Sequence, residues 1–288
     1  MKQGSGDLST PIKQSGITGL INMLSTRWKG VKRVFFIDMY CGTGKNVLSE
    51  GEIDGSPISL LSGLLKTIKS SNTKQEYGWA VLFNDISPGR ANFILPVNVM
   101  AWQEANNLVI DKNKLTAKTK LNDTFEAYIS YSCASSNDII QDIKWHLENS
   151  KNTHLIIMID PNGPKHVNWN ELKLLWDIYK KRVEFIIHIS ATTLKRVSKA
   201  KRATSFSYSY MPDHIGDMFD VFSYCGGWIR EPVDKDQWTM ALISNFEPKH
   251  GWNNKTASFH KISSEKGQEV ITKLSLTKAE WSEHYGCE

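Results

Sequence analysis

The sequence has few cysteines and no long apolar run, and each absence excludes a class of protein. Its 288 residues include only four cysteines, spaced far apart and without a Cys-x-x-Cys pair, so neither a disulfide framework nor a zinc site is predicted. The longest aliphatic runs have the length of a buried strand and fall short of the about 20 residues that span a bilayer. The polar start of the chain lacks the apolar run of a secretory signal. We therefore expect a cytoplasmic protein with no membrane association.

Motifs for metal binding, nucleophilic catalysis and phosphate binding are also missing. The eight histidines form no His-Glu-x-x-His spacing, and no nucleophile or catalytic triad stands out. Gly44-Lys45-Asn46 does not complete a P-loop, and the three-glycine dinucleotide fingerprint is absent. The sequence thus predicts no metal and no phosphate-cradling loop of either kind.

Apolar strands alternate with amphipathic helices along most of the chain. The hydrophobic patterns predict strands at 34–37, 79–83, 126–131, 155–159, 185–189 and 238–246. They predict helices at 17–28, 56–69, 88–96, 138–148, from Asn168 or Asn170 to 181, 212–222 and 264–274, and leave 97–124 unassigned. This alternation is typical of an α/β fold with a doubly wound, mostly parallel sheet and helices on both faces.

The most informative segment directly follows the first predicted strand and reads Asp-Met-Tyr-Cys-Gly-Thr-Gly, residues 38–44. Gly42 and Gly44 permit a sharp turn and a close approach of a ligand to the backbone. Ligands of open parallel sheets bind outside the carboxyl ends of the strands, where this loop lies. Asp38 and Asp85 end successive strands and suit S-adenosylmethionine, one near its ammonium group and the other near its ribose hydroxyls. The alternative is that both acids only cap turns or helices.

These residues carry a resemblance to a known class of enzymes. The segment 38–44 resembles the first motif of class I S-adenosylmethionine-dependent methyltransferases, with Tyr40 where many of them have the first glycine. An aromatic residue there resembles the pattern of methyltransferases that act on amino groups and DNA bases. The resemblance implies that the cofactor is contacted by Asp38, Tyr40, Gly42, Gly44 and Asp85.

The chain also resembles the three-Cys-motif partner protein family, a methyltransferase-like group, over about residues 15–246. The matching pieces are the N-terminal amphipathic segment, Phe35-Phe36-Ile37-Asp38, Gly42-Thr43-Gly44, Gly55-Ser56-Pro57-Ile58, Phe83-Asn84-Asp85 followed by Pro88 and Arg90, Asp160-Pro161-Asn162-Gly163, and the late strand at 239–245. This resemblance implies a Rossmann-like methyltransferase fold. We expect a helical lead-in over 1–30, the Rossmann-like domain over 31–250 and a C-terminal extension over 251–288.

Asp160-Pro161-Asn162 follows the fourth predicted strand, where such a fold places its methyl acceptor. Methyltransferases that act on base amino groups carry Asp-Pro-Pro and an aromatic residue there. The Asp160 carboxylate and the Pro161 carbonyl would draw the lone pair of an exocyclic amine toward the methyl group. No aromatic residue follows directly, so an extruded base would have to stack on Trp169, His166 or another loop. The alternative interpretation is a Pro-Asn-Gly-Pro turn.

Substrate contacts are predicted in a basic run and at one tryptophan. The net charge of +5 is modest, but five basic residues fall within eight positions after the fifth predicted strand: Lys195, Arg196, Lys199, Lys201 and Arg202. Such a run can hold the phosphates of a nucleic acid without reading its sequence, or can simply be a solvated loop. Trp228, beside Gly226-Gly227, is a candidate wall of the substrate pocket.

Taken together, the motifs predict a methyltransferase that uses S-adenosylmethionine and modifies an amino group of a DNA or RNA base. Two alternatives stay open. One keeps the cofactor and changes the acceptor to a protein or small molecule, which the missing aromatic after Pro161 favours. The other is a catalytically silent module that binds a protein partner through 97–124 or the C-terminal extension.

Overall fold

The structure is a computed structural model that describes residues 17–19, 21, 33–48, 51–70, 78–149, 152–160, 167–179, 182–190, 221–232, 238–245 and 258–275. It divides into two compact units, residues 1–159 and 160–288, each described here by itself. The predicted domain boundaries near 30 and 250 both fall outside the described residues and stay predictions.

The first unit is built on a mostly parallel sheet. Its strands lie in the order β7 (Thr153–Ile159), β1 (Arg33–Asp38), β4 (Gly78–Asn84), β6 (Thr124–Ser132) and β5 (Lys114–Lys118). The first four strands are parallel, and β5 pairs antiparallel with β6 at the edge. Because the chain goes from β1 outward to β4 and β6 and then returns to β7 on the other side, the sheet has a topological switch point between β1 and β7. Doubly wound sheets bind ligands at the carboxyl end of such a point.

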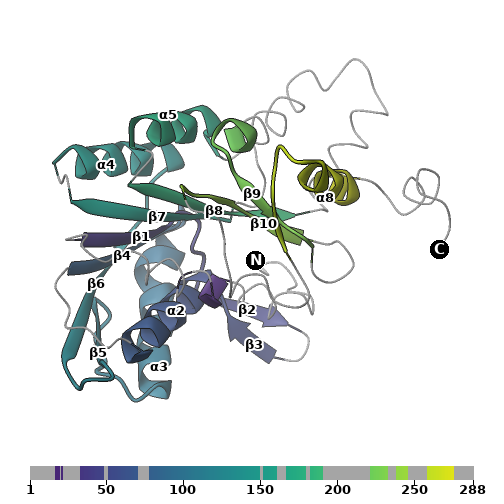
Figure 1. Cartoon of the computed structure of the whole chain (residues 1–288). Coiled ribbons are helices and arrows are strands. Elements are labelled where there is room, and N and C mark those ends of the chain that lie inside the picture. Colours follow the sequence, from purple (N-terminus) through teal and green to yellow (C-terminus); the bar gives the residue numbers. More distant parts are fainter. Residues whose placement is uncertain are drawn as a thin grey trace. The chain divides into compact units, whose positions relative to one another are not determined.

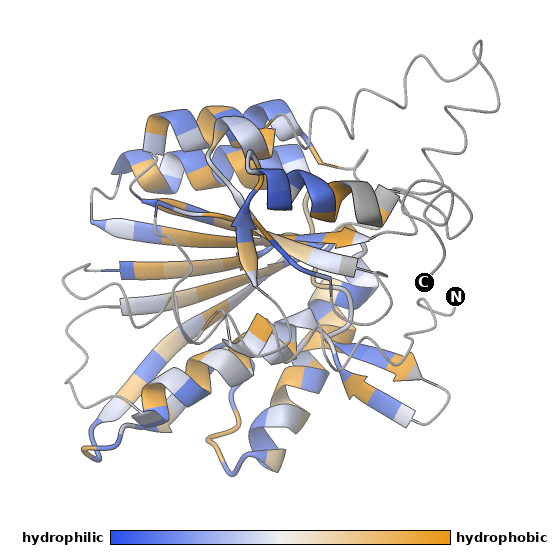
Figure 2. Ribbon diagram, turned by 45° about the vertical axis from the view of Figure 1, so that its right-hand side comes forward, coloured by the Kyte–Doolittle hydropathy of each residue, from blue (hydrophilic) through white to orange (hydrophobic). Residues whose placement is uncertain are grey.

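Helices cover both faces of this sheet. Figure 1 shows α2 (Ser56–Ser70) and α3 (Leu95–Ala105) on one face and α4 (Ser136–Asn149) on the other. Apolar side chains of the sheet fill the core, as the alternating burial of β1 shows: Val34 and Phe36 are fully buried, and Phe35 on the opposite face meets His146 of α4 edge to face at 5.4 Å. In Figure 2 the strands are largely hydrophobic and the helices mix hydrophobic with hydrophilic residues, as amphipathic helices do.

Two features near the glycine loop differ from the sequence prediction. A β-hairpin, β2 (Lys45–Leu48) and β3 (Gly51–Asp54), lies between the glycine loop and α2. The helix predicted at 88–96 begins as a π-helix, η1 (Gly89–Ile94), and continues without a break into α3. π-Helical turns are rare and often occur at functional sites.

The second unit contains a smaller antiparallel arrangement. Its strands lie in the order β8 (Val183–Ser190), β10 (Trp238–Ile243), β9 (Trp228–Arg230) and β11 (Phe259–Lys261), and each neighbouring pair is antiparallel. The helices α5 (Trp169–Tyr179) and α8 (Glu265–Ser275) belong to this unit. Trp176 of α5 packs on Phe185 of β8 with ring centroids 6.4 Å apart.

The predicted α/β class, with a mostly parallel sheet and helices on both faces, is confirmed. The six predicted strands correspond to β1, β4, β6, β7, β8 and β10, and the helices predicted at 56–69, 138–148 and 264–274 correspond to α2, α4 and α8. The helix at 17–28 is described only at 17–19 and 21, which are helical, and that at 212–222 only at its last two residues, also helical. The edge strands β5 and β11, and β9 between β11 and β10, were missed because they are short.

The start of α5 settles which asparagine caps it. The Asn168 Oδ1 atom accepts a hydrogen bond from the Glu171 backbone N–H at 3.3 Å, whereas Asn170 is exposed within the first turn of the helix. Asn168 therefore satisfies one of the four amide groups that a helix leaves unpaired at its N-terminus.

We predict that Asn168→Ala lowers the free energy of unfolding by about 1 kcal/mol, because the Glu171 amide loses its capping acceptor. Urea denaturation followed by circular dichroism measures the change. Asn170→Ala is the matched control and should leave the midpoint nearly unchanged. Equal effects of the two substitutions would show that Asn168 is not the cap.

Candidate cofactor site

The loop after β1 turns sharply at its two glycines. Gly42 and Gly44 have φ angles of +61° and +77°, a region that side chains with a Cβ atom rarely adopt. The loop is held from α3 as well, because the Asn98 side-chain amide donates to the Thr43 carbonyl at 2.8 Å. The bend predicted from the glycine spacing is therefore present.

After the hairpin β2–β3, the chain returns to the loop from which the hairpin starts. The Gly55 amide donates to the Gly44 carbonyl at 2.7 Å, which brings the chain back to the loop before α2 begins. The two backbones lie so close that a Cβ atom on Gly55 would meet the Gly44 carbonyl carbon at 2.8 Å. A Cβ atom on Gly44 would meet the Leu95 side chain at 2.6 Å. The two glycine motifs, 42–44 and 55–58, thus form one structural unit.

Asp38 ties the end of β1 to the loop and to the start of α2. Its side chain is fully buried and accepts hydrogen bonds from the Tyr40 backbone N–H at 3.1 Å and from the Ser56 hydroxyl at 2.8 Å. A carboxylate at a helix N-terminus is favoured by the helix dipole. The Gly55 carbonyl accepts the first hydrogen bond of α2, from the Ser59 amide, and the Ser56 hydroxyl binds Asp38.

Asp85, just after β4, binds the same loop from the neighbouring strand. Its Oδ2 atom accepts a hydrogen bond from the Gly42 amide at 3.0 Å and lies 3.7 Å from the Arg90 guanidinium. Its Oδ1 atom accepts from the Ser87 amide at 2.8 Å. The sequence placed Asp85 at the right strand end, but no sequence pattern indicated that it binds Gly42 directly.

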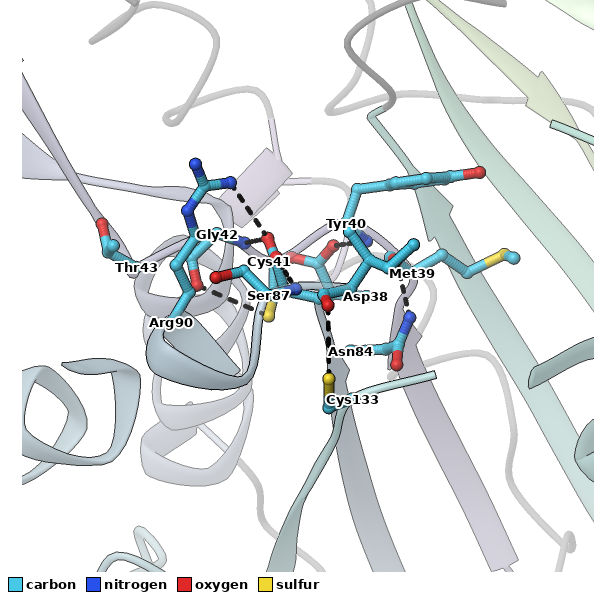
Figure 3. Close-up of polar contacts among 12 residues, drawn as sticks. Asp38, Met39, Tyr40, Cys41, Gly42, Thr43, Asn84, Ser87, Arg90 and Cys133 are labelled. Carbon is cyan, nitrogen blue, oxygen red and sulfur yellow. Dashed lines mark hydrogen bonds and ion pairs between the residues drawn. The ribbon is translucent and has the colours of Figure 1, made fainter. Parts of the chain in front are cut away.

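Three successive amides of the loop are therefore already paired within the protein. Tyr40 N–H binds Asp38, Gly42 N–H binds Asp85, and Cys41 N–H donates to the Asn84 carbonyl at 2.9 Å. Figure 3 shows the contacts of the Tyr40 and Gly42 amides, and the Asn84 side chain donates to the Met39 carbonyl at 3.2 Å. Phosphate-binding loops need such amides directed at the ligand. The paired amides of residues 40–42 cannot serve that purpose.

The electrostatic environment of the loop is negative. Burial, together with the charges of Asp38 and Asp85, raises the pKa of the Cys41 thiol far above its ordinary value, and the Arg90 charge offsets this only in part. Cys41 is thus a neutral thiol rather than a nucleophilic thiolate. Two carboxylates close to one glycine bend favour a cationic ligand over an anionic one.

Tyr40 lies in the loop but extends away from Arg90 and Thr43 (Figure 3). Burial raises the pKa of its hydroxyl, and a hydrogen bond with the Ser136 side chain at the start of α4 partly opposes this effect. Its backbone belongs to the bend, whereas its ring lies to one side of it.

The second unit contains the residue predicted to orient the methyl acceptor. Asp160 Oδ1 lies 2.8 Å from His188 Nδ1, so the two side chains form a pair. From the sequence, His188 lies near the carboxyl end of a predicted strand and could approach the site, although a histidine in an apolar strand is more often a buried structural residue. Its pairing with Asp160 was not predicted. Pro161 and Asn162 lie outside the described residues.

The predicted substrate contacts are described only at Trp228. Its backbone pairs with Leu242 and Lys261, and the Lys261 ammonium lies 5.6 Å from the centre of its ring, a cation–π contact. The basic run Lys195, Arg196, Lys199, Lys201 and Arg202 lies outside the described residues, so these contacts stay predictions.

Within the part of the chain that the structure describes, no group of acidic, histidine and cysteine side chains is arranged to hold a metal ion. No helix in that part has the length and hydrophobicity needed to cross a membrane.

Comparison with known proteins does not assign the chain to a family. No protein-family model matches it, and no curated protein matches it, so the resemblance to the three-Cys-motif partner family is not confirmed. Among solved structures, protein LPL1258 from Legionella pneumophila is 12% identical, with a TM-score of 0.49 over 91% of this chain and 99% of that chain. A protein from Streptomyces avermitilis is 10% identical, with a TM-score of 0.37 over 81% and 83%.

The plantazolicin methyltransferase BpumL, solved in complex with SAH, is also similar. It is 12% identical, with a TM-score of 0.35 over 92% of this chain and 80% of that chain. The structural neighbours thus include methyltransferases. Likenesses at this level do not identify an activity, which has to be inferred from the residues of the loop and the strand ends.

We predict that Gly55→Ala lowers the free energy of unfolding by about 1–3 kcal/mol, because the added Cβ atom forces the Gly44 carbonyl away and opens the base of the loop. Thermal and urea denaturation measure the loss. Gly89→Ala is the matched control, since a Cβ atom there meets nothing within 4 Å. A Gly55 variant as stable as the Gly89 variant would contradict the close packing of the two glycines.

Proposed function

We propose that the chain binds S-adenosylmethionine at the loop of residues 38–44 and transfers its methyl group to an acceptor. One observation carries the proposal: carboxylates at the ends of two neighbouring parallel strands are bonded to one glycine bend whose amides at 40–42 are paired. S-adenosylmethionine carries a sulfonium cation, an ammonium cation and one carboxylate, so its net charge is positive, and it has no phosphate. It therefore matches a negative loop that offers these amides to no anion.

The two acids have different roles in this proposal. Asp38 has no exposed surface, so it shapes the loop and contributes negative charge without touching the ligand. Asp85 is 7% exposed, and a carboxylate has about four acceptor positions, so it can accept further bonds from the ribose hydroxyls while holding Gly42. Asp85 follows β4, which is the neighbour of β1, and β1 is one of the two strands of the switch point at which doubly wound folds bind nucleoside ligands.

The chemistry requires little covalent participation by the protein. A lone pair of the acceptor attacks the methyl carbon, the carbon–sulfur bond breaks with its electron pair moving to sulfur, and S-adenosylhomocysteine leaves. The protein holds the two reactants in line and keeps water out. The loss of translational and rotational entropy then occurs on binding, and the barrier of the chemical step is lower.

For the acceptor, we propose an amino group of a DNA or RNA base. The support for this is the sequence alone: the Asp160-Pro161 step after β7 and the basic run at 195–202. Lysines and arginines spaced in this way can neutralise phosphates and position a polynucleotide.

We predict that S-adenosylmethionine at ~1 mM gives a binding signal in isothermal titration calorimetry and that ATP and NAD at the same concentration give none. Asp85→Asn should weaken cofactor binding about 10–100-fold, because hydrogen bonds to a charged acceptor are each worth about 1.5–3 kcal/mol. Circular dichroism confirms that the variant is folded.

The matched control for this titration is Asp54→Asn. That carboxylate pairs with Lys45 in the hairpin at 3.8 Å and is half exposed, so its loss should leave cofactor affinity unchanged. A wild-type protein that gives no heat with the cofactor, or one that binds ATP equally well, would refute the proposed site.

We predict salt-dependent binding of DNA or RNA in gel-shift assays at two salt concentrations. Each phosphate contact steepens the dependence of the logarithm of affinity on the logarithm of salt concentration by about 0.9 for duplex DNA. Replacing Lys195, Arg196 and Lys199 by alanine should reduce the magnitude of this slope by the amount expected for about three phosphate contacts. Affinity that is absent, or that does not change with salt, would count against a nucleic-acid acceptor.

A further inference from the structure

A cavity of about 400 Å³ lies at the amino ends of the strands of the first unit. Its lining residues come from the starts of β1, β4 and β7, from the middle of β6 and from α4, and all of them belong to this unit. The loop of residues 38–44 follows the opposite end of β1. The cavity is therefore separate from the candidate cofactor site.

The space exists because β4 has very small residues at this point. Gly78 and Ala80 alternate with Trp79 along the strand, so they lie on the same face of the sheet. The strand register places Ala80 between Phe35 of β1 and Tyr128 of β6. A Cβ atom added to Gly78 would meet nothing within 4 Å. Larger side chains of the neighbouring strands therefore border a gap that β4 does not fill.

Aromatic rings surround this gap. The His146 ring of α4 meets the Phe35 ring edge to face at 5.4 Å and the neighbouring Trp145 ring at 5.1 Å. Figure 1 shows α4 on this face of the sheet. Tyr128 of β6 is 64% exposed, and Trp145 is 60% exposed. Exposed rings gathered beside one hollow indicate an interaction site, unlike apolar residues scattered singly over a surface.

The charge of the cavity lining is positive. Among the lining residues, Arg33 and His146 are the two that can carry a charge at neutral pH. Arg33 lies two residues before Phe35, on the same face of β1, and no carboxylate of the described chain pairs with its guanidinium. The Glu126 carboxylate of β6 is already paired with Lys114 at 3.0 Å. The apolar cavity therefore has a cation available at one end.

We propose that this cavity binds a small planar aromatic molecule that carries one anionic group, such as a carboxylate. The rings of the ligand lie over Ala80 between Phe35 and Tyr128, and its anionic group pairs with the Arg33 guanidinium. The volume of the cavity falls within the range of about 300–1,000 Å³ that is typical of small-molecule sites. Burial of the rings supplies most of the affinity, and the ion pair sets the preference for an anion. This site is independent of the proposed methyl transfer.

The test compares 2-naphthoate with its neutral analogue 2-naphthamide by isothermal titration calorimetry on the full chain. We expect naphthoate to bind with a Kd below about 1 mM, and about tenfold more tightly than the amide. Arg33→Gln should remove this difference by weakening naphthoate binding alone. Lys69→Gln is the matched control, because it removes the same charge from the exposed end of α2 on the other face of the sheet, and both affinities should stay unchanged.

A second variant tests the place of binding. Ala80→Leu puts a larger apolar side chain into the cavity, so the affinity for both probes should fall at least about tenfold while circular dichroism shows a folded protein.

Three results would overturn the proposal. The first is a wild-type protein that binds neither probe at ~1 mM or binds both equally well. The second is an Ala80→Leu variant that is folded and binds as the wild type does. The third is an affinity for naphthoate that falls as the protein concentration rises, because a second copy of the chain would then cover the cavity.

Discussion

The hydrogen bond from the Gly42 amide to the Asp85 carboxylate is the interaction on which the candidate site depends. It joins the loop after β1 to the end of β4, at 3.0 Å, and the same carboxylate also accepts from Ser87. The side chain of Asn84, the last residue of β4, adds a second link between the two strand ends, because it donates to the Met39 carbonyl. The carboxylate sets both the shape of the bend and its charge.

The charge of the bend separates two kinds of nucleoside ligand that a doubly wound sheet can bind. Loops that hold phosphates leave their amides unpaired and directed at the anion. Here the amides at 40–42 are paired, and two carboxylates surround them, so the free energy of placing a phosphate beside the bend is unfavourable. The same two carboxylates attract the positive charge of a sulfonium nucleoside. The glycine spacing alone is shared by both kinds of loop, and it is the pairing of the amides that distinguishes them.

Sequence reasoning recovered the fold class and the residues of the bend because both follow from local patterns. Apolar runs of strand length identify β1, β4 and β7. Glycines with positive φ are expected where the chain bends sharply directly after a strand, as it does at Gly42 and Gly44. The hairpin between Gly44 and Gly55 was missed because its strands are four residues long. The Asp160–His188 pair was missed because residues 28 positions apart meet only through tertiary packing, which no periodicity encodes.

The most direct test of the central claim is residue-specific. Amide signals of the ¹⁵N-labelled protein can be followed by transverse-relaxation-optimised NMR while S-adenosylmethionine is added, with ATP as the comparison ligand. The structure leads us to expect shifts centred on Gly42, Gly44 and the residues after β4 with S-adenosylmethionine, and none there with ATP. Shifts of these amides with ATP, or an unperturbed loop at saturating S-adenosylmethionine, would contradict a bend that binds a sulfonium nucleoside.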